Sequence, residues 1–143
     1  PTLEQFLKTC VEFELVPVME VKSGVSANLD GLIQSIYASG FENSCIVTSF
    51  VTDVLAEVRY KDKKIKLMLL TNDEITQTEI VAASNIGHCD ISTGTPTQTG
   101  IVLVHKNNIK VNCWTINNME DAITYRGWAV DSITTDKISE VQI

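Results

Sequence analysis

The chain has 143 residues and a formal net charge of −7, and 44% of its residues are hydrophobic and 20% charged. These values fit one globular domain with a sizeable core and exclude a fibrous or disordered chain. The negative charge and the lack of a basic stripe exclude a general nucleic-acid surface, and no apolar run reaches the roughly 18 residues of a membrane span. The chain begins at Pro1 without Met or a signal-like segment, so we interpret it as a processed product or a fragment, in the cytoplasm or outside the cell.

Helix-type and strand-type patterns alternate along the chain. The capping-box residues Thr2 to Gln5 begin a first helix, and an apolar run from Val16 predicts a strand that ends at Glu20 and Lys22. Residues 23–28 are expected to form a loop. Further strands are expected at 45–50, 65–70, 89–92, 110–116 and 132–135, and helices at 29–37, 54–58, 75–84, 97–106 and 118–125, with a helical turn at 138–143. This alternation predicts six parallel strands covered by helices.

The first strand ends in a carboxylate and an ammonium group. Side chains of a strand alternate between its two faces, so Glu20 and Lys22 should share one face while Met19 and Val21 lie on the other. A carboxylate there can ligate a hard divalent cation, and the lysine can bind an anion such as phosphate. The alternative is a surface ion pair of little energetic value.

Polar or aromatic residues lie at the carboxyl end of nearly every predicted strand. In a (β/α)₈ barrel, the carboxyl ends of the strands hold the active site, so such residues would converge there. The alternative is that strand ends run into loops, which are polar in any fold. The residues concerned are Glu20, Lys22, Ser49, Phe50, Thr71, Asn72, Ser92, Thr93, Trp114, Thr115, Thr135 and Asp136.

The four cysteines lie far apart in the sequence, and three of them fall in strand-like runs. Their spacing matches no metal site, and a chain of this size does not need disulfides. We therefore expect buried free thiols. The cysteines are Cys10, Cys45, Cys89 and Cys113.

Five segments together resemble the glycerophosphodiester phosphodiesterases, in order and in approximate spacing. They are Pro1 to Gln5, Glu20 to Lys22, Ile46 to Phe50, Val111 to Asn118 and Val130 to Asp136. The resemblance implies a TIM barrel that hydrolyses glycerophosphodiesters to an alcohol and glycerol 3-phosphate with Mg²⁺ or Ca²⁺. This family function belongs to lipid and glycerol metabolism.

The resemblance also assigns roles to four positions. Glu20 matches a metal-ligating glutamate, and Lys22 matches a lysine that binds the phosphate. Trp114 would pack against the glycerol part of the substrate. Phe50, with Ser49, would line the pocket wall.

Other family motifs are missing from this chain. It has no His-Arg-Gly, no Glu-x-Asp pair and no His-Asp hairpin, so no catalytic residue is recognisable. His88 and His105 do not follow a strand, and we expect them to be structural or solvated. Residues 1–143 therefore resemble the carboxyl-terminal portion of the barrel, as a single domain without the first two strands. We expect the missing segment upstream or on a partner chain, because open sheet edges are a liability.

Two functions remain open from the sequence. One is the carboxyl-terminal part of a phosphodiesterase, inactive and without tight cation binding as an isolated 143-residue chain. The other is a non-catalytic binding or structural module of a larger assembly that recognises glycerophosphate polymers.

Overall fold

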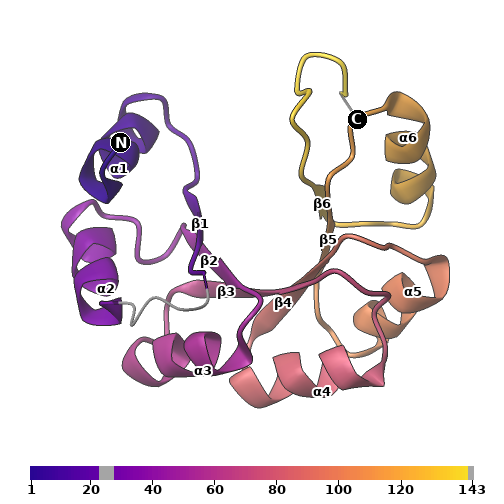
Figure 1. Cartoon of the computed structure of the whole chain (residues 1–143), viewed down its shortest axis with the longest axis horizontal. Coiled ribbons are helices and arrows are strands. Elements are labelled where there is room, and N and C mark those ends of the chain that lie inside the picture. Colours follow the sequence, from indigo (N-terminus) through magenta and orange to yellow (C-terminus); the bar gives the residue numbers. More distant parts are fainter. Residues whose placement is uncertain (23–27, 142–143) are drawn as a thin grey trace. The chain divides into compact units, whose positions relative to one another are not determined.

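The computed structural model describes residues 1–22 and 28–141 and contains six strands that alternate with six helices (Figure 1). The strands are β1 (Val18–Glu20), β2 (Ile46–Ser49), β3 (Lys66–Thr71), β4 (Cys89–Thr93), β5 (Val111–Cys113) and β6 (Ser132–Ile133). The helices are α1 (Leu3–Glu12), α2 (Leu29–Ala38), α3 (Thr52–Lys61), α4 (Gln77–Ile86), α5 (Gln98–Lys106) and α6 (Met119–Gly127). Strand order in the sheet follows sequence order, and the pairs β1–β2, β4–β5 and β5–β6 are parallel. The expected parallel α/β fold is confirmed.

Some boundaries differ from the prediction. The helix expected at 54–58 is the ten-residue α3, which buries Leu55 and Val58 and ends with basic residues that suit the negative end of its dipole. The strand expected at 110–116 is reduced to β5, although the backbone N–H of Ile116 still donates to Thr134 O at 2.9 Å. Residues 137–141 form a single turn, in which the backbone N–H groups of Glu140 and Val141 donate to Lys137 O at 2.8 and 3.0 Å, in keeping with the helical turn predicted there. Residues 23–27 of the loop predicted at 23–28 and the last two residues lie outside the described part.

The chain divides into two compact units, Pro1–Met68 and Leu69–Ile143. That the 143 residues act as one domain stays a prediction.

In the first unit, α1 contacts α2 and α3 packs on β2. The capping box predicted for α1 is present, because Thr2 and Gln5 each bind the other's backbone N–H. The register of β1 and β2 pairs Met19 with Val47, both buried. Apolar side chains of the helices and strands complete this core, namely Leu7, Ile36, Leu55, Val58 and Ile65.

A buried carboxylate fixes the turn between α3 and β3. Asp62 accepts hydrogen bonds from Tyr37 Oη at 2.6 Å and from the backbone N–H groups of Lys64 and Ile65 at 2.7 and 2.8 Å. Burial acts to raise the pKa of the Asp62 carboxyl, but these hydrogen bonds outweigh it and hold the pKa below its ordinary value. The hydrogen bond to Asp62 raises the pKa of Tyr37 to about 12.

In the second unit, α4 contacts β4 and α5 contacts β5. Their apolar faces meet the strands through side chains that are almost fully buried: Ile80, Ala83, Ile91, Ile101, Val104 and Val111. Helices α5 and α6 each begin at a capping side chain, Thr97 and Asn118 respectively.

All four cysteines are buried thiols that are not joined in disulfide bonds, as predicted. Burial raises the pKa of Cys45 to about 11 and that of Cys113 to about 12, so both remain neutral thiols at physiological pH. None of the described helices is long and apolar enough to cross a membrane.

Candidate functional site

A charged pair lies at the end of β1, where Glu20 is the last residue of the strand and Lys22 follows it by two residues. Along β1 the exposed Val18 and Glu20 flank the buried Met19, which is the alternation the sequence predicts. Glu20 Oε1 lies 3.8 Å from Lys22 Nζ, so the two side chains share a face. The Glu20 side chain is 35% exposed and that of Lys22 is 76% exposed. A pair at this distance and exposure contributes little stability, and both groups remain accessible to a ligand.

At the end of β2 lie Phe50, which is exposed, and Ser49, which is buried. Phe50 is 43% exposed, as a residue of a pocket wall would be. Ser49, expected beside it, is fully buried. Its hydroxyl donates to Val21 O at 2.7 Å and accepts from the backbone N–H of Val51 at 3.1 Å. Ser49 therefore holds the segment after β1 against the end of β2 and does not line a pocket.

Glu20 alone does not make a metal centre. Across residues 1–22 and 28–141, no group of three or more His, Cys, Asp or Glu side chains could hold a metal ion. Mg²⁺ and Ca²⁺ bind several oxygen ligands, of which Glu20 can supply one or two. Among the described residues, Glu20 could therefore supply only part of the ligands that such a cation needs.

In the second unit, a row of polar side chains runs across β4, β5 and the end of β6. Asn112 is 6% exposed, and its amide nitrogen donates to Ser92 Oγ at 2.7 Å and to Thr134 Oγ1 at 3.1 Å. Its amide oxygen accepts from Ser132 Oγ at 2.9 Å. This row, which we call the Asn112 ladder, fixes the register of three neighbouring strands because buried polar groups need their partners. Ser92, expected from its strand-end position to converge on an active site, is buried and serves this ladder instead.

Trp114 follows β5 and lies over the end of β4. A side-chain carbon added at Gly94 would meet Cη2 and Cζ2 of the indole at 3.2 Å. The backbone N–H of Trp114 donates to Thr93 O at 3.1 Å. Trp114 is half-buried, so part of its apolar surface remains available, as the predicted contact with glycerol requires.

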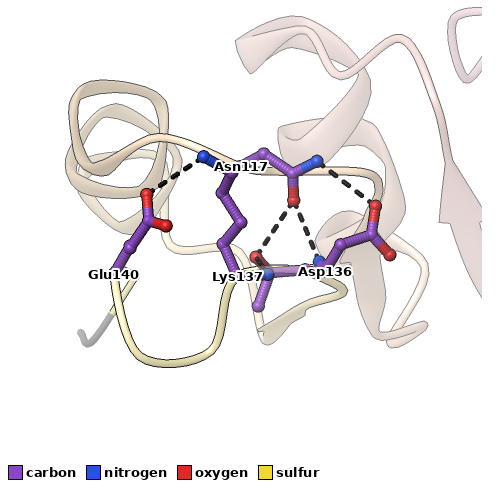
Figure 2. Close-up of polar contacts among 5 residues, drawn as sticks. Asn117, Asp136, Lys137 and Glu140 are labelled. Atoms are coloured by element: carbon purple, nitrogen blue, oxygen red, sulfur yellow. Dashed lines mark hydrogen bonds and ion pairs between the residues drawn. The ribbon is translucent and has the colours of Figure 1, made fainter.

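The loops after β5 and β6 are joined through Asn117 (Figure 2). The amide oxygen of Asn117 accepts from the backbone N–H of Asp136 at 2.9 Å and from Thr135 Oγ1 at 3.2 Å. Its amide nitrogen donates to Asp136 Oδ2 at 3.3 Å, and Lys137 pairs with Glu140 at 3.0 Å. The polar residues Thr135 and Asp136 thus bind the preceding loop, which is a structural task.

The histidines occupy the places the sequence predicts. His105 lies in the last turn of α5, where its Nε2 is 3.0 Å from Asp131 Oδ2. The same carboxylate oxygen accepts from the backbone N–H of Val111 at 2.9 Å, so His105 and Asp131 stabilise the start of β5. His88 is exposed in the turn before β4. Neither residue lies at the carboxyl end of a strand.

A model of the glycerophosphoryl diester phosphodiesterase family matches residues 1–140. The chain belongs to this family. The match covers nearly all of the sequence, so the resemblance carried by the five segments is confirmed. No curated protein sequence matches the chain.

Solved structures from the same family share the fold. A Silicibacter pomeroyi protein assigned as a glycerophosphoryl diester phosphodiesterase is 20% identical with a TM-score of 0.81, over 96% of this chain and 53% of that one. A glycerophosphodiester phosphodiesterase of Parabacteroides distasonis is 19% identical with a TM-score of 0.77, over 95% and 60%. An Oleispira antarctica phosphodiesterase, solved with the product sn-glycerol-3-phosphate, is 15% identical with a TM-score of 0.72, over 95% and 57%.

The chain thus spans a little over half the length of these relatives. Its six parallel strands and their helices follow the TIM-barrel fold of the family, as predicted. The roles of Glu20, Lys22, Phe50 and Trp114 stay predictions, for which the structure supplies the geometry described above.

Proposed function

We propose that the protein to which this chain belongs hydrolyses glycerophosphodiesters to an alcohol and glycerol 3-phosphate with a divalent cation, Mg²⁺ or Ca²⁺. The observation that carries the proposal is the family match over residues 1–140. Membership of the family supports a phosphodiesterase-like activity, and the products and the metal dependence are the parts that need testing.

Each site residue has a task in this proposal. Glu20 supplies an oxygen ligand to the cation, whose chemistry is to polarise the phosphoryl group when it is bound. The Lys22 ammonium binds the phosphate and offsets its charge, and its high exposure leaves it free to turn from Glu20 to a substrate. Phe50 and Trp114 present apolar surface to the glycerol part. No catalytic acid or base is assigned within these residues.

We propose further that the remaining barrel strands pair along β1 and β6, as another segment of the same protein or as a partner chain. The coverage of 53–60% of the relatives' chains supports this. Large apolar side chains near β1 are also more than half exposed, as an uncovered barrel edge requires. They are Phe13, Leu15, Val16 and Val18.

The test is release of glycerol 3-phosphate from glycerophosphocholine by the protein at its full natural length. Glu20→Ala should lower turnover by about 100-fold or more, because a cation ligand is lost. Glu12→Ala, at an exposed position of α1, is the matched control and should leave turnover unchanged. Unchanged turnover in Glu20→Ala would overturn the role of Glu20. The 143 residues alone should show neither turnover nor micromolar Mg²⁺ or Ca²⁺ binding in a calorimetric titration.

The second candidate is a non-catalytic module that binds polyglycerophosphate. The lack of a metal-ligand cluster in the described residues favours it. It predicts that the full-length protein binds polyglycerophosphate in the presence of Mg²⁺ and releases no glycerol 3-phosphate. Release by the wild type would exclude this candidate.

A further inference from the structure

We infer that Gly94 is a positioning residue for Trp114, and that the missing side chain at position 94 sets how far the indole lies from the glycerol of the substrate. The inference rests on the proposed function, because it takes Trp114 as a wall of the glycerol pocket. Gly94 itself belongs to none of the segments that carry the family resemblance.

The contact between the two residues is close. A Cβ atom at Gly94 would lie 3.2 Å from both Cη2 and Cζ2 of Trp114 and 3.5 Å from Cε2. Ordinary carbon contacts begin near 3.5 Å, so a methyl group would force one partner to move by a few tenths of an ångström. The indole therefore rests on the backbone of Gly94.

The backbone at Gly94 is held from both sides and cannot yield easily. The N–H of Gly94 donates to Thr71 O at 3.0 Å. The hydroxyl of Thr93 donates to Asp73 O at 2.8 Å, and that of Thr95 donates to Asn72 O at 2.7 Å. Two threonines thus fasten the loop after β4 to the loop after β3, and Gly94 lies between them.

The backbone of Trp114 is fixed as well. It donates to Thr93 O, and three residues later Asn117 binds the Thr135–Asp136 loop through three hydrogen bonds (Figure 2). A methyl group at Gly94 would meet the Trp114 ring, while the backbones of both residues are held in place. We therefore expect the indole ring to take up the displacement by turning about its own side-chain bonds, which changes its distance from the glycerol.

A methyl group at position 94 should affect only the turnover of substrates that carry glycerol. A shift of the pocket wall weakens contacts with the glycerol and leaves the groups that act on phosphate in place, so KM should rise more than kcat falls. A change of one methyl group in such a pocket alters kcat/KM by about tenfold. A phosphodiester without glycerol should be insensitive to it.

The test uses the protein at its full natural length, labelled with 5-fluorotryptophan. The fluorine resonance that disappears in Trp114→Phe is that of Trp114. Gly94→Ala should shift this resonance and lower kcat/KM for glycerophosphocholine about fivefold to tenfold, and Gly94→Val should increase both effects. Cleavage of bis(p-nitrophenyl) phosphate should stay within about twofold of wild type. Gly127→Ala is the matched control, because a Cβ at Gly127 meets no atom within 4 Å.

An unmoved Trp114 resonance in Gly94→Ala, or an equal loss on both substrates, would overturn the inference. If the wild type releases no glycerol 3-phosphate, the proposed function is wrong. The fluorine resonance alone then decides whether Gly94 positions Trp114.

Discussion

The polar side chains at β1 and those at β5 differ in their exposure and in the contacts that they make. After β1, the charged groups of Glu20 and Lys22 are 3.8 Å apart and 35% and 76% exposed. At β5, Asn112 is 6% exposed and takes part in three hydrogen bonds, and Asn117 joins two loops. The first end keeps its polar groups accessible, whereas the second uses them to hold the backbone. Polar side chains at these strands therefore differ in whether they are left exposed to solvent or used to hold the backbone, and burial separates the two.

Because of this contrast, substitutions near the end of β1 and substitutions in the Asn112 ladder should have different effects. Residues after β1 should alter activity while leaving the folded state intact, because exposed ion pairs contribute little stability. Residues of the Asn112 ladder should alter stability first, because removing one member leaves buried polar groups without partners. The predictions below test this division.

Among the substitutions below, Lys22→Met in the full-length protein should have the largest effect on activity. Loss of the ammonium that we propose binds the phosphate should lower kcat/KM for glycerophosphocholine about 100-fold, which corresponds to about 2.7 kcal/mol. Lys8→Met, at an exposed position of α1, should leave kcat/KM unchanged. A loss below about threefold for Lys22→Met would remove Lys22 from the site.

The second prediction concerns the Asn112 ladder. Asn112→Ala removes the three hydrogen bonds and leaves Ser92 with a buried hydroxyl, so the free energy of unfolding should fall by about 3 kcal/mol. Urea unfolding monitored by circular dichroism measures it. Asn85→Ala, on the exposed face of α4, should change it by less than about 0.5 kcal/mol. Equal effects of the two substitutions would contradict a stabilising ladder.

Periodicity was sufficient to predict the alternating strands and helices, whereas the barrel was implied by the family resemblance. Every predicted strand and helix has a counterpart among the described residues, because apolar alternation in strands and 3.6-residue spacing in helices follow directly from burial. The closeness of Glu20 and Lys22 was also predictable, since two residues of separation in a strand place side chains on one face.

The roles of the other polar strand-end residues were not predictable, because they depend on partners about 20 residues away in the sequence. Ser92, Asn112 and Ser132 are spaced at equal intervals of 20 residues along the chain and lie on neighbouring strands. That equal spacing is the signal that could have identified the ladder. Nothing in the sequence marks Gly94 as the support of Trp114, since only the tertiary contact reveals it.

The third prediction concerns the buried carboxylate of Asp62, in contrast to the exposed carboxylate of Glu20. Asp62 has a lowered pKa, so its contribution to stability is present above the unfolded-state pKa of about 4 and is lost as the pH falls through the folded-state pKa. Asp62→Asn should lower the free energy of unfolding by about 2 kcal/mol at pH 7 and flatten its fall below pH 4. Asp30→Asn is the control, since the Asp30 side chain is 81% exposed. An unchanged acid profile in Asp62→Asn would contradict the proposed cause.

The smallest effect is expected for the stability contribution of the Glu20–Lys22 pair itself. The two charges are 3.8 Å apart in a well-solvated position, so side-chain entropy and screening by salt offset most of their attraction. A double-mutant cycle of Glu20→Gln and Lys22→Met should give a coupling free energy below about 0.5 kcal/mol in urea unfolding at 0.15 M salt. The unfolding midpoint of each single variant should stay close to that of the wild type. A coupling above about 1 kcal/mol would mean that the pair stabilises the strand end, as a structural ion pair would. That result, together with unchanged activity in Lys22→Met, would assign both residues to the structure of the barrel and leave the binding of phosphate to other groups.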